Sequence, residues 1–91
     1  MDVLLLAIDI GTSGCKVTLF KENGEGAGTV TEGYRLFMPQ PGYVEQDPEE
    51  WWQAVCTACQ RLFQKTGILP QNIAGIGIDG QSWSAIPVDS D

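Results

Sequence analysis

Short runs of hydrophobic residues, separated by glycine-rich turns, divide the chain into predicted strands and one helix. Residues 3–10 are almost all apolar, which predicts a strand buried on both faces. Residues 15–20 alternate polar and apolar side chains, as expected for a second strand that forms a hairpin with the first. An Asn-Gly turn at residues 23–24 then leads into a third strand, predicted over residues 27–37.

The middle of the chain predicts one amphipathic helix over residues 47–65. Asp47 can cap the free backbone N–H groups, Pro48 suits the first helical position, and Gly67 marks the end. The apolar positions at helical spacing are Trp51, Trp52, Val55, Cys59, Leu62 and Phe63. We interpret the two tryptophans as core or domain-interface residues, and the Cys56 and Cys59 pair as helix packing rather than a thioredoxin-type motif.

A fourth strand is predicted over residues 73–79, where apolar and small residues alternate. Because a long helix separates it from the third strand, it is expected to run parallel to the first after a right-handed crossover. Residues 84–88 begin another short strand that has no partner, so we expect the chain to be truncated. The predicted fold class is α/β, an incomplete mixed sheet of three antiparallel strands, a crossover helix and a parallel fourth strand.

Composition narrows the possible functions of the 91 residues, which suffice for one small domain. The chain carries 12 acidic and 5 basic residues, and its scattered cations exclude a nucleic-acid-binding face. The absence of histidine excludes Ser-His and Cys-His pairs and His-ligated zinc within the chain. The apolar run at residues 3–8 is too short for a signal peptide or a membrane span. Three cysteines, an odd number, favour a reduced, cytoplasmic location.

Residues 9–16 gather the side chains best suited to hold a phosphate and a metal ion. Gly11 lets backbone N–H groups approach an anion, while Thr12 and Ser13 add hydroxyl donors. Lys16 can neutralise phosphate charge, and Asp9 can hold Mg²⁺ through water. The spacing differs from that of a Walker A loop. The alternative is a plain hairpin turn whose glycine and hydroxyl residues serve geometry alone.

The order of the motifs resembles that of a known enzyme family. Residues 9–16 resemble the first phosphate motif of the superfamily of actin, hexokinase and the heat-shock ATPases. Residues 42–52 resemble the segment leading into the first helix of FGGY carbohydrate kinases, and residues 76–81 their next strand and sugar-facing loop. The matches cover nearly the whole chain, and within the family they are similar to the amino-terminal end of xylulokinase-like members. Residues 1–91 would then be the amino-terminal part of the first of two actin-like, ribonuclease-H-like domains.

The resemblance implies ATP-dependent phosphorylation of a sugar, either a ketose such as xylulose or a polyol, with Mg²⁺ as a cofactor. It assigns Asp9 as the metal-linked acid and residues 11–13, with Lys16, to the nucleotide phosphates. Gln81, Ser82 and Trp83 would lie at the sugar pocket, although Ser82-Trp83 replaces the usual Met-His pair and leaves the sugar open.

The family's catalytic base is an aspartate farther downstream, so the resemblance implies no catalytic residue here and an inactive chain on its own. Asp79 is interpreted as a structural acid at the end of a strand, and Glu45 as a solvated loop acid.

Two other interpretations are open. A small dimeric aspartic hydrolase would explain the chain length and an acid near Gly-Thr-Ser, but the sequence Asp9-Ile10-Gly11-Thr12 lacks the consecutive Asp-Thr-Gly that such enzymes use. A non-catalytic half-domain would instead pair its exposed strand edges with a second copy and form a homo-oligomer.

Overall fold

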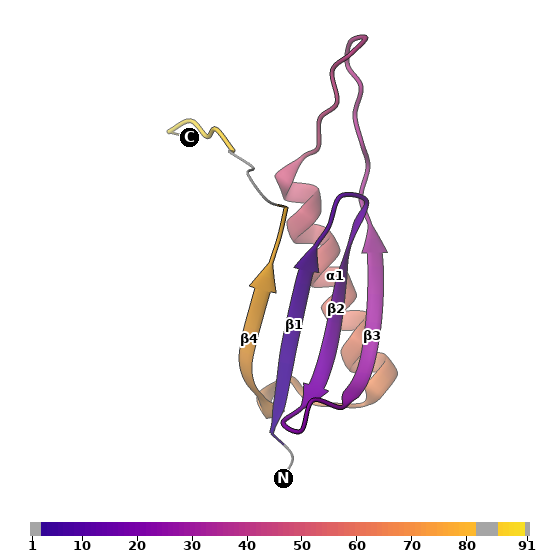
Figure 1. The fold of residues 1–91 in the computed structure, drawn as a ribbon, viewed down its shortest axis with the longest axis vertical. Coiled ribbons are helices and arrows are strands. Elements are labelled where there is room, and N and C mark those ends of the chain that lie inside the picture. Colours follow the sequence, from indigo (N-terminus) through magenta and orange to yellow (C-terminus); the bar gives the residue numbers. More distant parts are fainter. Residues whose placement is uncertain (1–2, 82–85, 91) are drawn as a thin grey trace.

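The structure is a computed structural model that describes residues 3–81 and 86–90. Within these residues, one mixed sheet carries a long helix on one face, and Figure 1 shows the helix behind the strands. In chain order the elements are β1 (Leu4–Ile10), β2 (Gly14–Lys21), β3 (Gly26–Gly33), α1 (Pro48–Thr66), the short 3₁₀ turn η1 (Pro70–Asn72) and β4 (Ile73–Asp79).

The strands lie in the order β3-β2-β1-β4. β2 runs antiparallel to both β1 and β3, whereas β4 runs parallel to β1. The predicted arrangement of three antiparallel strands, a crossover helix and a parallel fourth strand is therefore confirmed. Because β1 and β4 are parallel, their carboxyl ends lie at the same end of the sheet, which is also where the β1–β2 turn lies (Figure 1).

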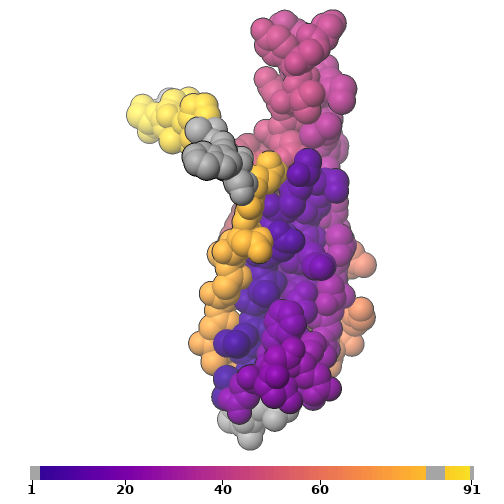
Figure 2. All heavy atoms as spheres, viewed as in Figure 1, coloured from indigo at the N-terminus to yellow at the C-terminus, as the bar shows by residue number. Residues whose placement is uncertain are grey.

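The core lies between α1 and the face of the sheet that it covers. Alternate residues of β1 and β2 point into this layer, and α1 contributes Ala58 and Leu62, neither of which is exposed. Leu5, on the opposite face of β1, is 44% exposed. The prediction that the first strand is buried on both faces is therefore wrong for the described residues, because α1 covers one face only; Figure 2 shows the other.

β4 extends beyond the cover of α1, which packs on β2 and β3. Ile76 and Ile78 share a face with the buried Leu6 and Ile8 of β1, yet they are 62% and 69% exposed. The described residues thus leave an apolar strip on β4 that is not covered.

The third strand ends at Gly33 rather than at residue 37, because its partner β2 begins at Gly14 and offers no residue beyond it. The chain then forms a loop over residues 34–47, in which Phe37 and Glu45 exchange two backbone hydrogen bonds of 2.7 Å. This loop projects beyond the end of the sheet in Figure 1 and returns at the start of α1. Glu45 is exposed, as expected for a solvated loop acid.

The ends of α1 are as predicted. The Asp47 carboxylate accepts a hydrogen bond of 3.0 Å from the N–H of Glu49, and Gly67 adopts a left-handed conformation with φ 72°. Trp52, however, is 65% exposed, because neighbouring residues on a helix point about 100° apart and Trp51 faces inward. A domain-interface role for Trp52 stays a prediction.

The final strand that was predicted over residues 84–88 does not form where the chain can be described. Residues 84 and 85 lie outside the described residues, and residues 86–88 carry no regular secondary structure. Among the described residues, no helix is both long and apolar enough to cross a membrane.

Candidate functional site

The β1–β2 turn, residues 11–13, is the centre of the candidate site. The N–H of Gly11 donates to the carbonyl oxygen of Gly14 at 3.0 Å and closes the turn. Thr12 and Ser13 are exposed, and within the described residues their backbone N–H groups make no hydrogen bond. The turn therefore presents two free N–H donors and two hydroxyls, which is a suitable set for binding an anion.

Tyr34 holds the turn from its carbonyl side. Its hydroxyl donates a hydrogen bond to the carbonyl oxygen of Gly11, and its backbone N–H donates to the carbonyl oxygen of Ser13 at 3.3 Å. Burial raises the pKa of Tyr34 above its ordinary value, and the neighbouring Cys15 and Asp9 raise it further. The hydroxyl therefore stays protonated and able to donate.

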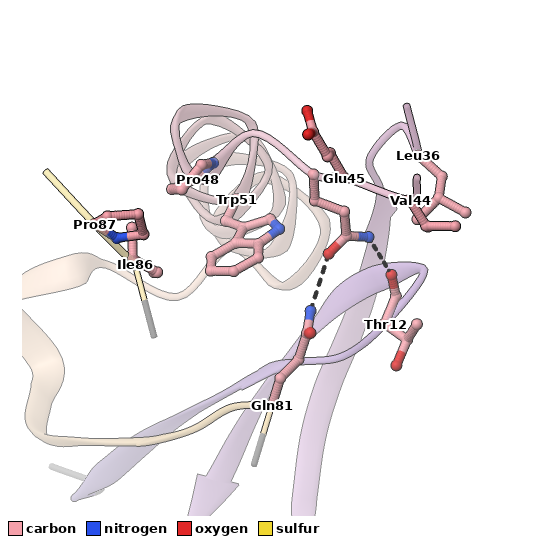
Figure 3. A pocket seen from close by; sticks show the side chains of 10 residues that line it. Thr12, Leu36, Val44, Glu45, Pro48, Trp51, Gln81, Ile86 and Pro87 are labelled. Atoms are coloured by element: carbon pink, nitrogen blue, oxygen red, sulfur yellow. Dashed lines mark hydrogen bonds between the residues drawn. The ribbon is translucent and has the colours of Figure 1, made fainter. Parts of the chain in front are cut away.

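Two glutamines complete the support of the turn. The side-chain amide nitrogen of Gln46 donates to the carbonyl oxygen of Thr12. That of Gln81 donates to the carbonyl oxygen of Gly11 at 3.2 Å. It also donates to the side-chain oxygen of Gln46 at 3.0 Å, a bond drawn in Figure 3. With its carbonyl groups engaged on one side, the turn is held with its free N–H groups available for a ligand.

Asp9 and Asp79 form a carboxylate pair at the carboxyl ends of two parallel strands. They are directly paired in the register of β1 and β4, on the face of the sheet opposite α1. The hydrogen bond to Asp9, with desolvation and the charge of Asp9, raises the pKa of Asp79 above its ordinary value. The parallel register places the Asp79 carboxyl beside Asp9 at the end of the strand, and the interpretation of Asp79 as a structural acid stays a prediction.

Lys16 flanks this pair from the other side, since it is the register partner of Asp9 on β2. It is exposed and forms no ion pair within the part of the chain that the structure describes. Its ammonium is therefore available to an anion that approaches the end of the hairpin.

The donor set fits a magnesium ion that keeps most of its water. Mg²⁺ is commonly bound through one or two carboxylates together with substrate phosphates, and Asp9 and Asp79 supply two adjacent carboxyl groups. No group of three or more metal-ligating side chains gathers among the described residues, so the protein ligands alone do not form a closed metal cage there.

A hollow of about 650 Å³ opens beside the turn, on the side of α1. Its walls include Thr12, Gln46, Trp51 and Gln81, and Figure 3 shows the Trp51 indole lying between the residue 86–87 segment and Gln81. The indole nitrogen of Trp51 is buried and has no hydrogen-bond partner among the described residues. A hollow with an aromatic wall and amide groups has the character of a small-molecule site.

The structure brings most of the predicted site residues to one end of the sheet. Asp9, residues 11–13, Lys16 and Gln81 all lie at or beside the β1–β2 turn. Ser82 and Trp83 lie outside the described residues. The sequence did not predict that Tyr34 and Gln46 support the turn. Gln46 lies within residues 42–52, which resemble the kinase family, so the resemblance could have pointed to it. Tyr34 was identifiable only as an apolar position in the predicted third strand.

Comparison with solved structures identifies the fold. A xyloylose kinase from Brucella ovis superposes with a TM-score of 0.77 and 36% sequence identity, covering 86% of this chain and 16% of that one. The architecture is therefore the ribonuclease-H-like fold of the actin-like ATPases.

Sequence comparison then identifies the family. Residues 4–91 match the N-terminal domain of the FGGY family of carbohydrate kinases. A glycerol kinase of Ligilactobacillus salivarius is 37% identical over 90 residues, which is 99% of this chain and 18% of the relative. A xylulose kinase of Escherichia coli K12 is 39% identical over 87 residues, 96% of this chain and 18% of the relative. The chain belongs to the FGGY family of carbohydrate kinases, and it spans less than a fifth of these relatives' length.

Proposed function

We propose that the protein carrying this chain is an ATP-dependent carbohydrate kinase. Residues 1–91 would be the amino-terminal part of its first domain, and the reaction would transfer the γ-phosphoryl group of ATP to a hydroxyl of a ketose or polyol. Membership of the FGGY family supports the reaction class. The observation that carries the proposal is the β1–β2 turn, which offers two free N–H groups between an acid and a lysine.

Each residue of the turn has a role in this reaction. The N–H groups and hydroxyls of Thr12 and Ser13 would bind phosphate oxygens. A Cβ atom at Gly11 would lie 3.1 Å from the carbonyl oxygen of Gly14, so the tight turn favours glycine there. Lys16 would neutralise charge on the terminal phosphates. Phosphoryl transfer depends on positioning and electrostatic stabilisation, which are what these groups supply.

Asp9, with Asp79 beside it, would hold Mg²⁺ through its water shell. The ion would neutralise negative charge on the phosphates. The catalytic base is assigned to an aspartate beyond residue 91, so the chain alone is expected to be inactive.

The sugar would bind at the hollow beside Gln81, and the family resemblance assigns Ser82 and Trp83, the next two residues of the chain, to the same pocket. The relatives include a glycerol kinase and a xylulose kinase at similar identity, which supports a polyol or a ketose without choosing between them. The aspartic hydrolase interpretation finds no support in these comparisons. Cytoplasmic location and self-association through strand edges stay predictions.

The proposal is tested with the full-length protein. ADP release is measured over a panel that includes xylulose, glycerol and gluconate, and we expect sugar-dependent turnover with at least one. Asp9→Asn should then lower kcat roughly 100-fold, with a smaller loss for Lys16→Ala, because each removes charge stabilisation at the phosphates. Glu22→Gln, an exposed acid at the opposite end of the hairpin, is the matched control. No sugar-dependent turnover with any member of the panel would refute the proposal.

A further inference from the structure

Gln46 joins two segments that are far apart in the sequence. Its amide nitrogen donates to Thr12 O in the β1–β2 turn, and its oxygen accepts from the amide nitrogen of Gln81, which follows β4. Figure 3 shows these two hydrogen bonds as a continuous path from Gln81 to Thr12. Gln46 thus adds a second link between the turn assigned to phosphates and the segment assigned to the sugar, beside the hydrogen bond from Gln81 to Gly11 O.

The order of donors and acceptors along this path admits one orientation of each amide. Thr12 O can only accept, so the nitrogen of Gln46 must face it and the oxygen of Gln46 must face Gln81. The nitrogen of Gln81 must then face both Gln46 and Gly11 O, as observed. The oxygen of Gln81 is left without a partner among the described residues, and Gln81 lines the hollow.

The backbone around Gln46 is itself fixed. The preceding residue, Glu45, is tied to Phe37 by two backbone hydrogen bonds of 2.7 Å, and the following residue, Asp47, caps α1. The Gln46 side chain is half-buried between these anchors. A side chain whose backbone is held at both flanks can transmit the position of one segment to the other.

We propose that Gln46 is a positioning residue that sets the geometry of the phosphate turn relative to the sugar segment. This inference rests on the proposed kinase function. The free oxygen of Gln81 accepts a hydroxyl of the substrate, and that hydroxyl is thereby connected through Gln46 to Thr12. The substrate class is one that presents a hydroxyl donor at this position, as sugars and polyols do.

Three variants of the full-length protein test the proposal. Gln46→Ala removes both hydrogen bonds and leaves Thr12 O without its donor. We expect kcat/KM to fall about tenfold for both ATP and the sugar. Gln46→Glu keeps an acceptor for Gln81 but cannot donate to Thr12 O. It should raise KM for ATP and lower kcat while leaving KM for the sugar near its original value. Gln53→Ala removes an exposed glutamine of α1 and is the matched control.

Comparing KM for ATP with KM for the sugar distinguishes a positioning role of Gln46 from a purely structural one. A variant that only destabilises the fold lowers the melting temperature and the active fraction, with both KM values unchanged, and that outcome would overturn the proposal. So would Gln46→Glu raising KM for the sugar as much as Gln46→Ala does. If Gln46→Ala does not fold, Gln46→Glu together with Gln81→Ala supplies the same comparison.

A double-mutant cycle gives an independent measurement. Because Gln46 acts partly through Gln81, the Gln46→Ala and Gln81→Ala losses in kcat/KM should not multiply, and the double variant should resemble the more impaired single variant. Losses that multiply would contradict the link. Failure of the kinase function itself is recognised separately, since the unmutated protein would then show no sugar-dependent ADP release.

Discussion

Replacing Gly14 with alanine tests whether the β1–β2 turn depends on close contact between β2 and β3. Gly14 is the first residue of β2, directly after the turn, and it is paired with Gly33 at the end of β3. A Cβ atom at Gly14 would lie 2.5 Å from the carbonyl oxygen of Glu32 and 3.1 Å from the Cα of Gly33. Both contacts are with backbone atoms, which cannot rotate away as a side chain would.

The size of the effect follows from these contacts. Real Cβ atoms essentially never lie closer than 3.0 Å to another heavy atom, so the strands must separate by at least 3.0 − 2.5 = 0.5 Å at this point. Overpacking of this kind costs about 1–3 kcal/mol, and the lower conformational entropy of alanine in the unfolded chain offsets about 0.5–1 kcal/mol. We therefore expect Gly14→Ala to lower the free energy of unfolding by about 0.5–2 kcal/mol.

The assay combines urea unfolding with calorimetric titration of an ATP analogue into the full-length protein. Gly14→Ala should be less stable and should bind the nucleotide more weakly, because the displaced strand end moves the N–H groups of Thr12 and Ser13. Gly26→Ala, at the other end of the hairpin with nothing within 4 Å of its Cβ position, is the control. It should leave the affinity unchanged and should not lower the stability, since only the entropic gain of about 0.5–1 kcal/mol applies there. A Gly14→Ala variant with the original stability and affinity would show that this close contact does not hold the turn.

Two further predictions concern stability. Leu62→Ala removes a side chain with no exposed surface and should lower the free energy of unfolding by about 2–5 kcal/mol, whereas Leu69→Ala, at a position 54% exposed, should cost far less; equal losses in urea unfolding would contradict this. Arg35 lowers the pKa of Glu50 below its ordinary value through a hydrogen bond and ion pair of 2.9 Å. The pair therefore stabilises the fold above the unfolded-state pKa of Glu50 and stops doing so as the pH falls through the lower folded-state value. Glu50→Gln should make the free energy of unfolding depend less on pH in that acidic range. An unchanged pH dependence would argue against a stabilising role for the Arg35–Glu50 pair.

Local patterns were sufficient to predict most of the fold. The Asp47 cap, Gly67 and the alternation in β1 and β2 each reflect interactions between residues close in sequence, and the parallel pairing of β4 follows from the intervening helix. The end of β3 could not be predicted in this way. It is set by where β2 begins, which is a property of the partner strand rather than of residues 34–37.

The candidate site was predictable where its residues share one hairpin and unpredictable where distant segments meet. Asp9 and Lys16 are seven residues apart in sequence and lie opposite one another in the antiparallel register. The hydrogen bonds of Tyr34 and Gln46 to the turn span 23 and 34 residues. Such contacts depend on the path of the loop that follows β3, and the pattern of polar and apolar residues does not predict that path.

The β1–β2 turn is expected to bind the phosphates of a nucleotide. An experimental structure of the full-length protein with magnesium and a non-hydrolysable ATP analogue tests it most directly. We expect phosphate oxygens within hydrogen-bond distance of the backbone N–H groups of Thr12 and Ser13, with the metal on the side of Asp9. Phosphates bound elsewhere, with these N–H groups left in contact with water, would contradict it.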